Sequence, residues 1–313
     1  MSRFWVYFLA KNSVTPQAGV AFRPIDISFA GLLAAGMTTV PITTLPLFPR
    51  LDGHLIDLLR TLPAADWTRP TRARQWTVRD VAAHLLDGNL RAIALYRDGF
   101  MGEAAPAITS YGELVAYLNE LNATWVRAAR RLSPALLTDL LELTGRDYVA
   151  QLQQLDPFAD AVFSVAWAGD QVSPNWFHIA REYTEKFHHQ LQIREAVDQP
   201  EPLRHPDLFR PFIHTLLCGL PHTYRNVVLP EGATVQFRIG DLGDWYLLRQ
   251  ADHWQLRDGT APGRSVAGLT LPPDTAWKLF TKGLSPADAR TTAQLTGDTA
   301  VAAVALTLVA VMA

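Results

Sequence analysis

The chain has 313 residues, 49% of them hydrophobic and 19% charged, and its formal net charge is −2. This length allows two domains of ordinary size, and the balance of residue types is typical of a globular protein. The chain contains no Lys/Arg cluster dense enough to follow a phosphate backbone, which argues against a nucleic-acid partner.

Cysteine and hydrophobic content indicate the compartment. Cys218 is the only cysteine, so no internal disulfide can form, and we expect a reducing, cytoplasmic compartment. Its neighbours in FIHTLLCGL are apolar, which favours a buried and inert thiol. Two apolar stretches, residues 4–10 and 299–313, are shorter than the roughly 18 residues that span a bilayer. We therefore expect no membrane span, and we predict that the second stretch is a buried closing helix.

The first 36 residues differ from the rest of the chain. They show no sustained hydrophobic period, whereas a clean amphipathic pattern begins soon after Met37. We expect Met37 to be the natural start and residues 1–36 to be an upstream extension or a disordered leader. A short docking segment is the alternative.

Before residue 200, apolar residues recur at helical spacing in several segments. The predicted helices are 47–62, 77–98, 111–132, 133–155 and 173–199. Thr77 is the expected N-cap of the second helix, with Asp80 as its capping partner and Gly99 as its end. The fourth helix is expected to be interrupted near Gly145. Four or five helices of this length, joined by modest loops, predict an antiparallel bundle over residues 37–204.

The last predicted helix of this bundle begins at a proline. Ser173 is its expected N-cap, Pro174 occupies its first turn, and Pro200 follows its end.

The pattern changes after residue 205. A helical segment, 206–227, precedes three segments of alternating hydrophobicity, which are 233–240, 244–250 and 253–259. Residues 265–283 and 291–313 each have a strand pattern followed by a helix pattern. We therefore predict a smaller α+β domain over residues 205–313.

One helix carries a polar stripe with metal-ligand chemistry. His178, Glu182, Glu185 and His189 fall within an arc of roughly 60°, at about 100° per residue. Apolar and aromatic residues flank the stripe, and its burial in a bundle would be costly without a compensating partner. Glu185 and His189 lie one turn apart, as two ligands of one ion would. A solvated polar face remains the alternative.

A catalytic metal site needs a third protein ligand. His84 lies in the middle of the second predicted helix, among Ala and Leu residues. It is a candidate because this helix and the striped helix can face each other in a bundle. A solitary histidine on a helix is, however, more often a hydrogen-bonded core residue, and Glu-x3-His alone is a weak signal.

Four segments of the chain resemble known protein families. The segments WTVRDVAAHLLDGNLRA (76–92) and REYTEKFHHQLQIREAVDQP (181–200) resemble the signature helices of the DinB-like family, in its mycothiol-dependent maleylpyruvate isomerase branch. The segments AWKLFTKG (276–283) and LTGDTAVAAVALTLVAVMA (295–313) are similar to the sterol-carrier-protein-like domain often joined to that bundle. The resemblance to the bundle covers roughly residues 47–200.

The resemblance implies a site and a chemistry. In that family a divalent metal, typically zinc, is held by a histidine and a Glu-x3-His pair, which match His84, Glu185 and His189. The metal binds a low-molecular-weight thiol as the thiolate, which attacks an electrophile. The thiol is mycothiol, bacillithiol or glutathione. We therefore expect a thiol-dependent isomerase or S-transferase that acts on a small-molecule electrophile.

Four further residues are candidates around this site. Asp87 and Glu182 are the nearest groups for proton transfer. Arg91 and Arg194 are candidates for contact with the carboxylates of a substrate or cofactor, and solvent-exposed helix arginines are the alternative.

Two other functions remain open. A metal-dependent hydrolase would use the same ligands with water instead of a thiol. A non-enzymatic protein would hold an apolar ligand in its C-terminal domain. The sequence indicates neither the substrate nor the oligomeric state.

Overall fold

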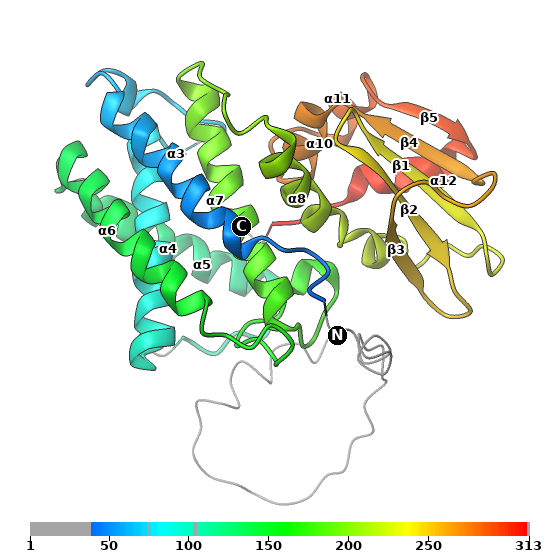
Figure 1. Ribbon diagram of the computed structural model, residues 1–313, viewed down its shortest axis with the longest axis horizontal. Helices are drawn as coiled ribbons and strands as arrows, with labels where there is room; N and C mark the ends of the chain where they lie inside the picture. Colours follow the sequence, from blue (N-terminus) through cyan, green and yellow to red (C-terminus); the bar gives the residue numbers. More distant parts are fainter. Residues whose placement is uncertain (1–38, 74, 103–104, 312–313) are drawn as a thin grey trace, which may run out of the picture.

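The computed structural model describes residues 39–73, 75–102 and 105–311, and it has a helical region followed by an α+β region (Figure 1). This coarse prediction of the fold is confirmed. The expectations for residues 1–36 and for Met37 lie outside the described residues. Among the described residues, each helix is either too short or too polar to cross a lipid bilayer.

The long helices before residue 200 contact one another. They are α3 (Phe48–Thr61), α4 (Val78–Asp98), α5 (Tyr111–Ala129), α6 (Pro134–Leu152) and α7 (Asn175–Ala196). Short 3-10 turns accompany them at Leu45–Leu47, Asp66–Thr68 and Ala166–Ala168. Helix α4 packs against α5, α6 and α7, so it lies at the centre of the helical region. The site described below draws its residues from α4 and α7.

Local signals set the limits of α4 as predicted. The Thr77 side chain accepts from the amide of Asp80, and the Asp80 carboxylate accepts from the amide of Thr77, 3.1 Å away. These two bonds form a capping box, which satisfies two of the amides left free at a helix start. Gly99, with φ of 66°, ends the helix in the left-handed conformation that glycine adopts without strain.

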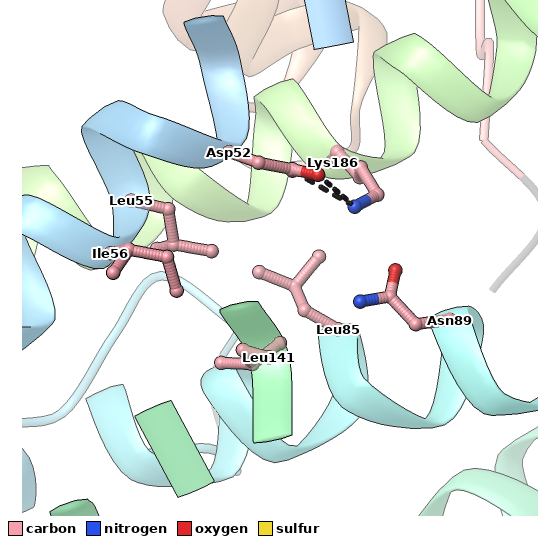
Figure 2. A pocket seen from close by; sticks show the side chains of 7 residues that line it. All are labelled: Asp52, Leu55, Ile56, Leu85, Asn89, Leu141 and Lys186. Atoms are coloured by element: carbon pink, nitrogen blue, oxygen red, sulfur yellow. Dashed lines mark hydrogen bonds and ion pairs between the residues drawn. The ribbon is translucent and has the colours of Figure 1, made fainter. Parts of the chain in front are cut away.

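The predicted interruption of α6 near Gly145 is wrong. The helix is continuous through this residue. A Cβ atom at Gly145 would lie 3.0 Å from Oδ2 of Asp52 on α3, so the glycine lets the two helices approach closely. Beside this contact, Asp52 and Lys186 form an ion pair at 2.9 Å on the wall of a small pocket between α3, α4, α6 and α7 (Figure 2).

The predicted N-cap of α7 is wrong by one residue. Pro174 holds the N-cap position, and it offers no side-chain hydrogen bond to the helix. Ser173 is buried and instead donates to Asp170 at 2.7 Å while it accepts from the amide of Val165 at 2.9 Å. Its hydroxyl therefore fixes the preceding loop rather than the helix.

The α+β region is built on one five-stranded sheet. Its strands are β1 (Thr234–Ile239), β2 (Gly243–Arg249), β3 (Trp254–Asp258), β4 (Ala267–Leu271) and β5 (Gln294–Gly297). The order is β3-β2-β1-β4-β5, and the β1–β4 pair is parallel while the other pairs are antiparallel. The predicted strands are therefore present. The accompanying helices are α8 (Pro206–Leu217), α9 (Leu220–Thr223), α10 (Pro273–Phe280), α11 (Pro286–Arg290) and α12 (Thr299–Ala303).

The predicted closing helix is shorter than expected. After α12 the chain forms one 3-10 turn, Val304–Thr307, and continues in extended form. β-branched residues are frequent here and lower helix propensity. The amide of Ala310 donates to the carbonyl of Phe280 on α10, at 2.8 Å, instead of continuing a helix. Five of its side chains are buried, those of Ala302, Ala305, Leu306, Leu308 and Ala310, whereas Thr307 and Val309 are exposed.

Helix α8 connects the two regions. Phe212 on α8 stacks against Phe187 on α7, with ring centroids 4.5 Å apart, and both rings are fully buried. α8 also contacts α10. Apolar packing therefore runs continuously from α7 into the sheet, where Trp245 and Phe237 are buried in the same cluster.

Candidate metal centre

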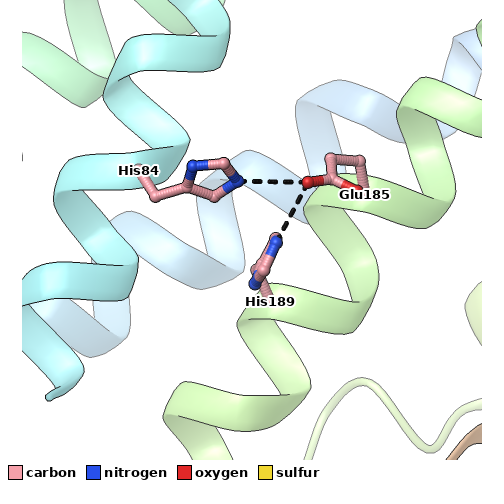
Figure 3. A group of neighbouring side chains, drawn as sticks. All are labelled: His84, Glu185 and His189. Carbon is pink, nitrogen blue, oxygen red and sulfur yellow. Dashed lines mark hydrogen bonds and ion pairs between the residues drawn. The ribbon is translucent and has the colours of Figure 1, made fainter. Parts of the chain in front are cut away.

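Three side chains from two helices converge on one point. His84 extends from the middle of α4, and Glu185 and His189 extend from successive turns of α7 (Figure 3). The Oε1 atom of Glu185 lies 3.1 Å from Nε2 of His84 and 3.0 Å from Nε2 of His189. The three ligand atoms all lie within 4.8 Å of one another. The structure thus brings together the three residues that the sequence singled out as ligands.

This arrangement fits a divalent ion. Donor atoms bound at about 2.0–2.1 Å to a tetrahedral ion are separated by roughly 3.3 Å, close to the two distances seen here. The side chains of His84 and His189 are only 14% and 8% exposed, while that of Glu185 is 40% exposed. The imidazoles are therefore held by packing, and the site remains open on the side of the carboxylate, where a further ligand can enter.

The electrostatics of His84 and Glu185 favour the protonation states in which each can bind a metal ion. Burial lowers the pKa of His84, which keeps its imidazole neutral. Partial burial alone would raise the pKa of Glu185, but His189 and His84 together hold it well below its usual range. Two neutral imidazoles and one carboxylate leave a bound divalent ion with a net positive charge. Such a site can accept an anionic ligand.

The orientation of His189 is set by a neighbour on α7. Oε1 of Gln192 lies 2.9 Å from Nδ1 of His189, and Nε2 of Gln192 lies 3.0 Å from Nε2 of His188. Because the amide oxygen can only accept, Nδ1 of His189 donates to it, which leaves Nε2 as the nitrogen that would bind a metal ion. Gln192 therefore supplies the kind of outer contact that metal-bound histidines usually have.

An aromatic ring closes one side of the site. The ring of Trp76, just before the N-cap of α4, lies 4.9 Å from that of His84 and 6.2 Å from that of His189. Trp76 is half-buried and packs on the apolar cluster of the helical region. An apolar wall of this kind limits the access of water to the imidazoles.

Glu182 belongs to a separate polar cluster, further toward the N-terminus of α7. It accepts from the hydroxyl of Tyr148 at 2.7 Å and from the guanidinium of Arg181. Burial would raise the pKa of Glu182, but the charge of Arg181 lowers it. Arg181 also donates to Nδ1 of His178 at 3.0 Å, and Nε2 of His178 lies 2.6 Å from the hydroxyl of Tyr96. The predicted stripe therefore contains two groups. Glu185 and His189 form the proposed ligand pair, whereas His178 and Glu182 belong to this separate cluster.

Asp87 and Arg91 lie one turn and two turns beyond His84 on α4. Asp87 is 9% exposed, and burial raises the pKa of its carboxyl group. Nη1 of the exposed Arg91 lies 3.7 Å from its Oδ2. Both residues therefore extend from the turns of α4 that follow the first ligand.

Arg194 does not have the surroundings expected of a cofactor-binding group. It is 4% exposed, and its guanidinium donates to the backbone carbonyls of Gln199, Glu201 and His54. These contacts tie the end of α7 to α3. They give Arg194 a structural role, and we do not include it in the proposed site.

Sequence reasoning missed two contributors, Trp76 and Gln192. Gln192 carried a local signal, because it follows His189 by three residues and so lies on the same face of the helix. Trp76 precedes the N-cap of α4, and its position depends on how the preceding turn folds back.

The helical region resembles a known protein family. Residues 48–194 match the family model of the mycothiol maleylpyruvate isomerase N-terminal domain. The helical region is therefore similar to the N-terminal domain of this family. The match spans α3 to α7 and includes His84, Glu185 and His189. The resemblance of the helical region to the mycothiol-dependent maleylpyruvate isomerase family is thus confirmed.

Two solved structures, both of a mycothiol-dependent maleylpyruvate isomerase, align with most of this chain at low sequence identity. A mutant form of mycothiol-dependent maleylpyruvate isomerase superposes with a TM-score of 0.49 at 14% identity, over 83% of this chain and 96% of that chain. Another structure of the isomerase superposes with a TM-score of 0.44 at 13% identity, over 78% and 91% of the two chains. The search of curated proteins gave no match.

Proposed function

We propose that this protein is a divalent-metal-binding enzyme that uses a low-molecular-weight thiol to isomerise or conjugate a small electrophile. The observation that carries the proposal is the convergence of His84, Glu185 and His189 on one point, although His84 and Glu185 are 101 positions apart in sequence. The family of the helical region supports the thiol chemistry. Zinc is the proposed metal because two imidazoles and a carboxylate suit it.

The sulfur must come from a bound thiol. A divalent ion in this site would stabilise a thiolate, because free thiols with a pKa of about 8.5 are mostly protonated at neutral pH. The protein's own Cys218 is unsuitable. Burial raises the pKa of its thiol to about 12, and its Sγ contacts the carbonyl of His214 within its own helix. Mycothiol, bacillithiol and glutathione remain the candidate cofactors.

The residues around the ligands have distinct proposed roles. Asp87 is the stronger candidate for proton transfer, since burial raises the pKa of its carboxyl group toward neutral pH. Arg91 extends from the same face of α4 and is 55% exposed, so it is placed to meet an anionic substrate. Glu182 has both oxygens engaged by Tyr148 and Arg181, which favours a role in holding those two groups.

The finer architecture belongs to the same proposal. We infer a DinB-like four-helix arrangement for residues 37–204 and a sterol-carrier-like domain for residues 205–313, in a cytoplasmic enzyme. Large aromatic side chains, including Trp245, Phe237 and Phe280, fill the interior of the α+β region. This packing supports an enzyme over a carrier of an apolar ligand.

The test is a thiol panel. The purified protein is incubated with mycothiol, bacillithiol or glutathione and with maleylpyruvate or monochlorobimane, with and without a chelator. We expect at least one thiol to support conversion of an electrophile, and we expect the chelator to abolish it. His84→Ala should be inactive, whereas His253→Ala, at an exposed position, should keep wild-type activity. Conversion that persists in the chelator would contradict the proposal.

The partly exposed Glu185 also permits a metal-dependent hydrolase, in which water takes the open position. Chelator-sensitive hydrolysis of an ester or amide without any added thiol would select this second function.

A further inference from the structure

The wall of the metal centre is tied to the α+β region through Arg72. The guanidinium of Arg72 makes two parallel bonds to Glu195 on α7, at 2.8 Å and 2.6 Å, and a third to the carbonyl of Gly283, at 3.1 Å. Nζ of Lys278 on α10 lies 2.8 Å from the same Glu195 carboxylate. One arginine thus joins the turn before α4, the helix with two proposed ligands, and the segment after α10.

The groups around Arg72 hold its side chain in one orientation. Burial alone would raise the pKa of Glu195, but hydrogen bonds from Arg72 and Lys278 lower it to about 2, so the carboxylate stays charged. Bidentate pairing of this kind fixes both the distance and the plane of the guanidinium. Gly283 leaves room for the side chain, because a Cβ atom there would lie 2.7 Å from Cδ of Arg72.

The same turn carries Trp76. The amide of Thr71 donates to the carbonyl of Trp76 at 3.0 Å, and the Thr71 hydroxyl donates to the same oxygen at 2.8 Å. The amide of Trp76 donates back to the carbonyl of Ala73 at 2.7 Å. The backbone of Trp76 is therefore fixed to residues that flank Arg72, while its ring lies against the imidazole of His84.

We propose that Arg72 is a positioning residue through which the α+β region holds Trp76 against the imidazoles of the metal centre. The inference rests on the proposed metal centre for its function, but the mechanical link from Arg72 to Trp76 stands on contacts of its own. By this link the α+β region shapes a site whose three proposed ligands all belong to the helical region.

The experiment compares five variants of the full chain with the wild type. Arg72→Ala removes the link, and Arg72→Lys keeps the charge beside Glu195 without the second arm to Gly283. Trp76→Leu removes the wall, and the double variant Arg72→Ala/Trp76→Leu tests whether the two act together. Arg204→Ala is the matched control, because Arg204 is an exposed arginine whose ion-pair partner is Asp274 on α10.

The first measurement is the rate at which Zn²⁺ passes from the loaded protein to a competing chelator. We expect release about 10-fold faster in Arg72→Ala and in Trp76→Leu, as for other outer contacts of metal sites. The double variant should release no faster than Trp76→Leu alone, since Arg72 acts through the indole. Arg72→Lys should be intermediate, and Arg204→Ala should match the wild type. Additive effects in the double variant would overturn the inference.

The second measurement needs no metal. Hydrogen exchange of the peptide that contains Thr71 and Trp76 is followed in metal-free protein, with the peptides of α4 and α6 as internal references for folding. Arg72→Ala should raise exchange in that peptide alone. Unchanged exchange would overturn the inference. If the wild type binds no Zn²⁺ but Arg72→Ala still raises exchange in this peptide, the proposed function is refuted while the link is supported.

Discussion

The imidazole of His189 is held at both ends, by Gln192 on one side and by Glu185 on the other. Nδ1 lies 2.9 Å from Oε1 of Gln192, and Nε2 lies 3.0 Å from Oε1 of Glu185. All three residues belong to α7. The orientation of this proposed ligand is therefore fixed within a single helix, while the other imidazole must be supplied by α4.

The amide of Gln192 should control metal affinity. Gln192→Leu removes the acceptor at Nδ1 of His189, so the ring loses its fixed tautomer and orientation. We expect divalent-metal affinity to fall by about 10- to 100-fold, as measured by competition with a chelator. Gln192→Glu keeps an acceptor and should retain tight binding. Gln153→Leu, at an exposed position at the end of α6, serves as the control. Equal affinities in Gln192→Leu and the control would contradict the proposed role.

The sequence was most informative where the signal was local. Thr77, Asp80 and Gly99 predicted both ends of α4 because capping depends on residues a few positions apart. Glu185 and His189 were found in the same way, since they lie one turn apart. The predicted interruption at Gly145 was wrong because a glycine within a helix has the same local pattern whether it breaks the helix or allows a neighbouring helix to pack closely. Only the packing of Asp52 distinguishes the two cases.

Local sequence patterns do not predict contacts between distant segments of the chain. His84 pairs with Glu185 across 101 positions, and its proposed role as a ligand follows from the family resemblance rather than from its neighbours. Arg194 was assigned to the cofactor from its charge and position on the helix, but three backbone carbonyls occupy its guanidinium. Those carbonyls come from segments whose arrangement the sequence does not reveal.

The close contact at Gly145 predicts opposite effects at two glycines. In Gly145→Ala the new methyl group lies 3.0 Å from Oδ2 of Asp52 and displaces the carboxylate that binds Lys186 (Figure 2). We expect the free energy of unfolding to fall by about 1–3 kcal/mol, as in other overpacked interiors. Gly53→Ala in α3 has no atom within 4 Å of its Cβ and should raise it by about 0.5–1 kcal/mol. Denaturant unfolding of both variants tests this. Stabilisation by Gly145→Ala would refute the close packing.

The cluster around Glu182 predicts a structural penalty. Glu182 is the partner of Arg181, and their side chains are only 20% and 24% exposed. Glu182→Gln would leave Arg181 without its counter-charge, and we expect a loss of about 3 kcal/mol in the free energy of unfolding. Tyr148→Phe removes one hydrogen bond to the carboxylate and should cost about 1.5 kcal/mol.

Glu142→Gln provides the comparison for this prediction. Glu142 pairs with Arg146 and with Arg60, whose side chains are 75% and 50% exposed, so the loss of its charge should cost no more than about 1 kcal/mol. A Glu182→Gln variant that is as stable as Glu142→Gln, yet has lost activity in the thiol panel, would instead support proton transfer by Glu182.

Buried His178 predicts how stability depends on pH. Burial, assisted by the nearby charge of Arg181, lowers the pKa of His178 from 6.5 to about 4. Between these values the unfolded chain takes up a proton that the folded protein does not. The contribution of this group to stability is therefore complete above pH 6.5 and is lost as the pH falls toward 4. The loss is about 1.4 kcal/mol for each pH unit.

The measurement is the difference in unfolding free energy between the wild type and His178→Gln, taken from pH 7.5 to 4.5 in the presence of a chelator. Glutamine does not titrate, so the advantage of the wild type over this variant should shrink by on the order of 2 kcal/mol over that range. Contributions from other titrating groups cancel in the difference. A constant difference for His178→Gln would show that residue 178 takes up its proton equally in the folded and unfolded protein.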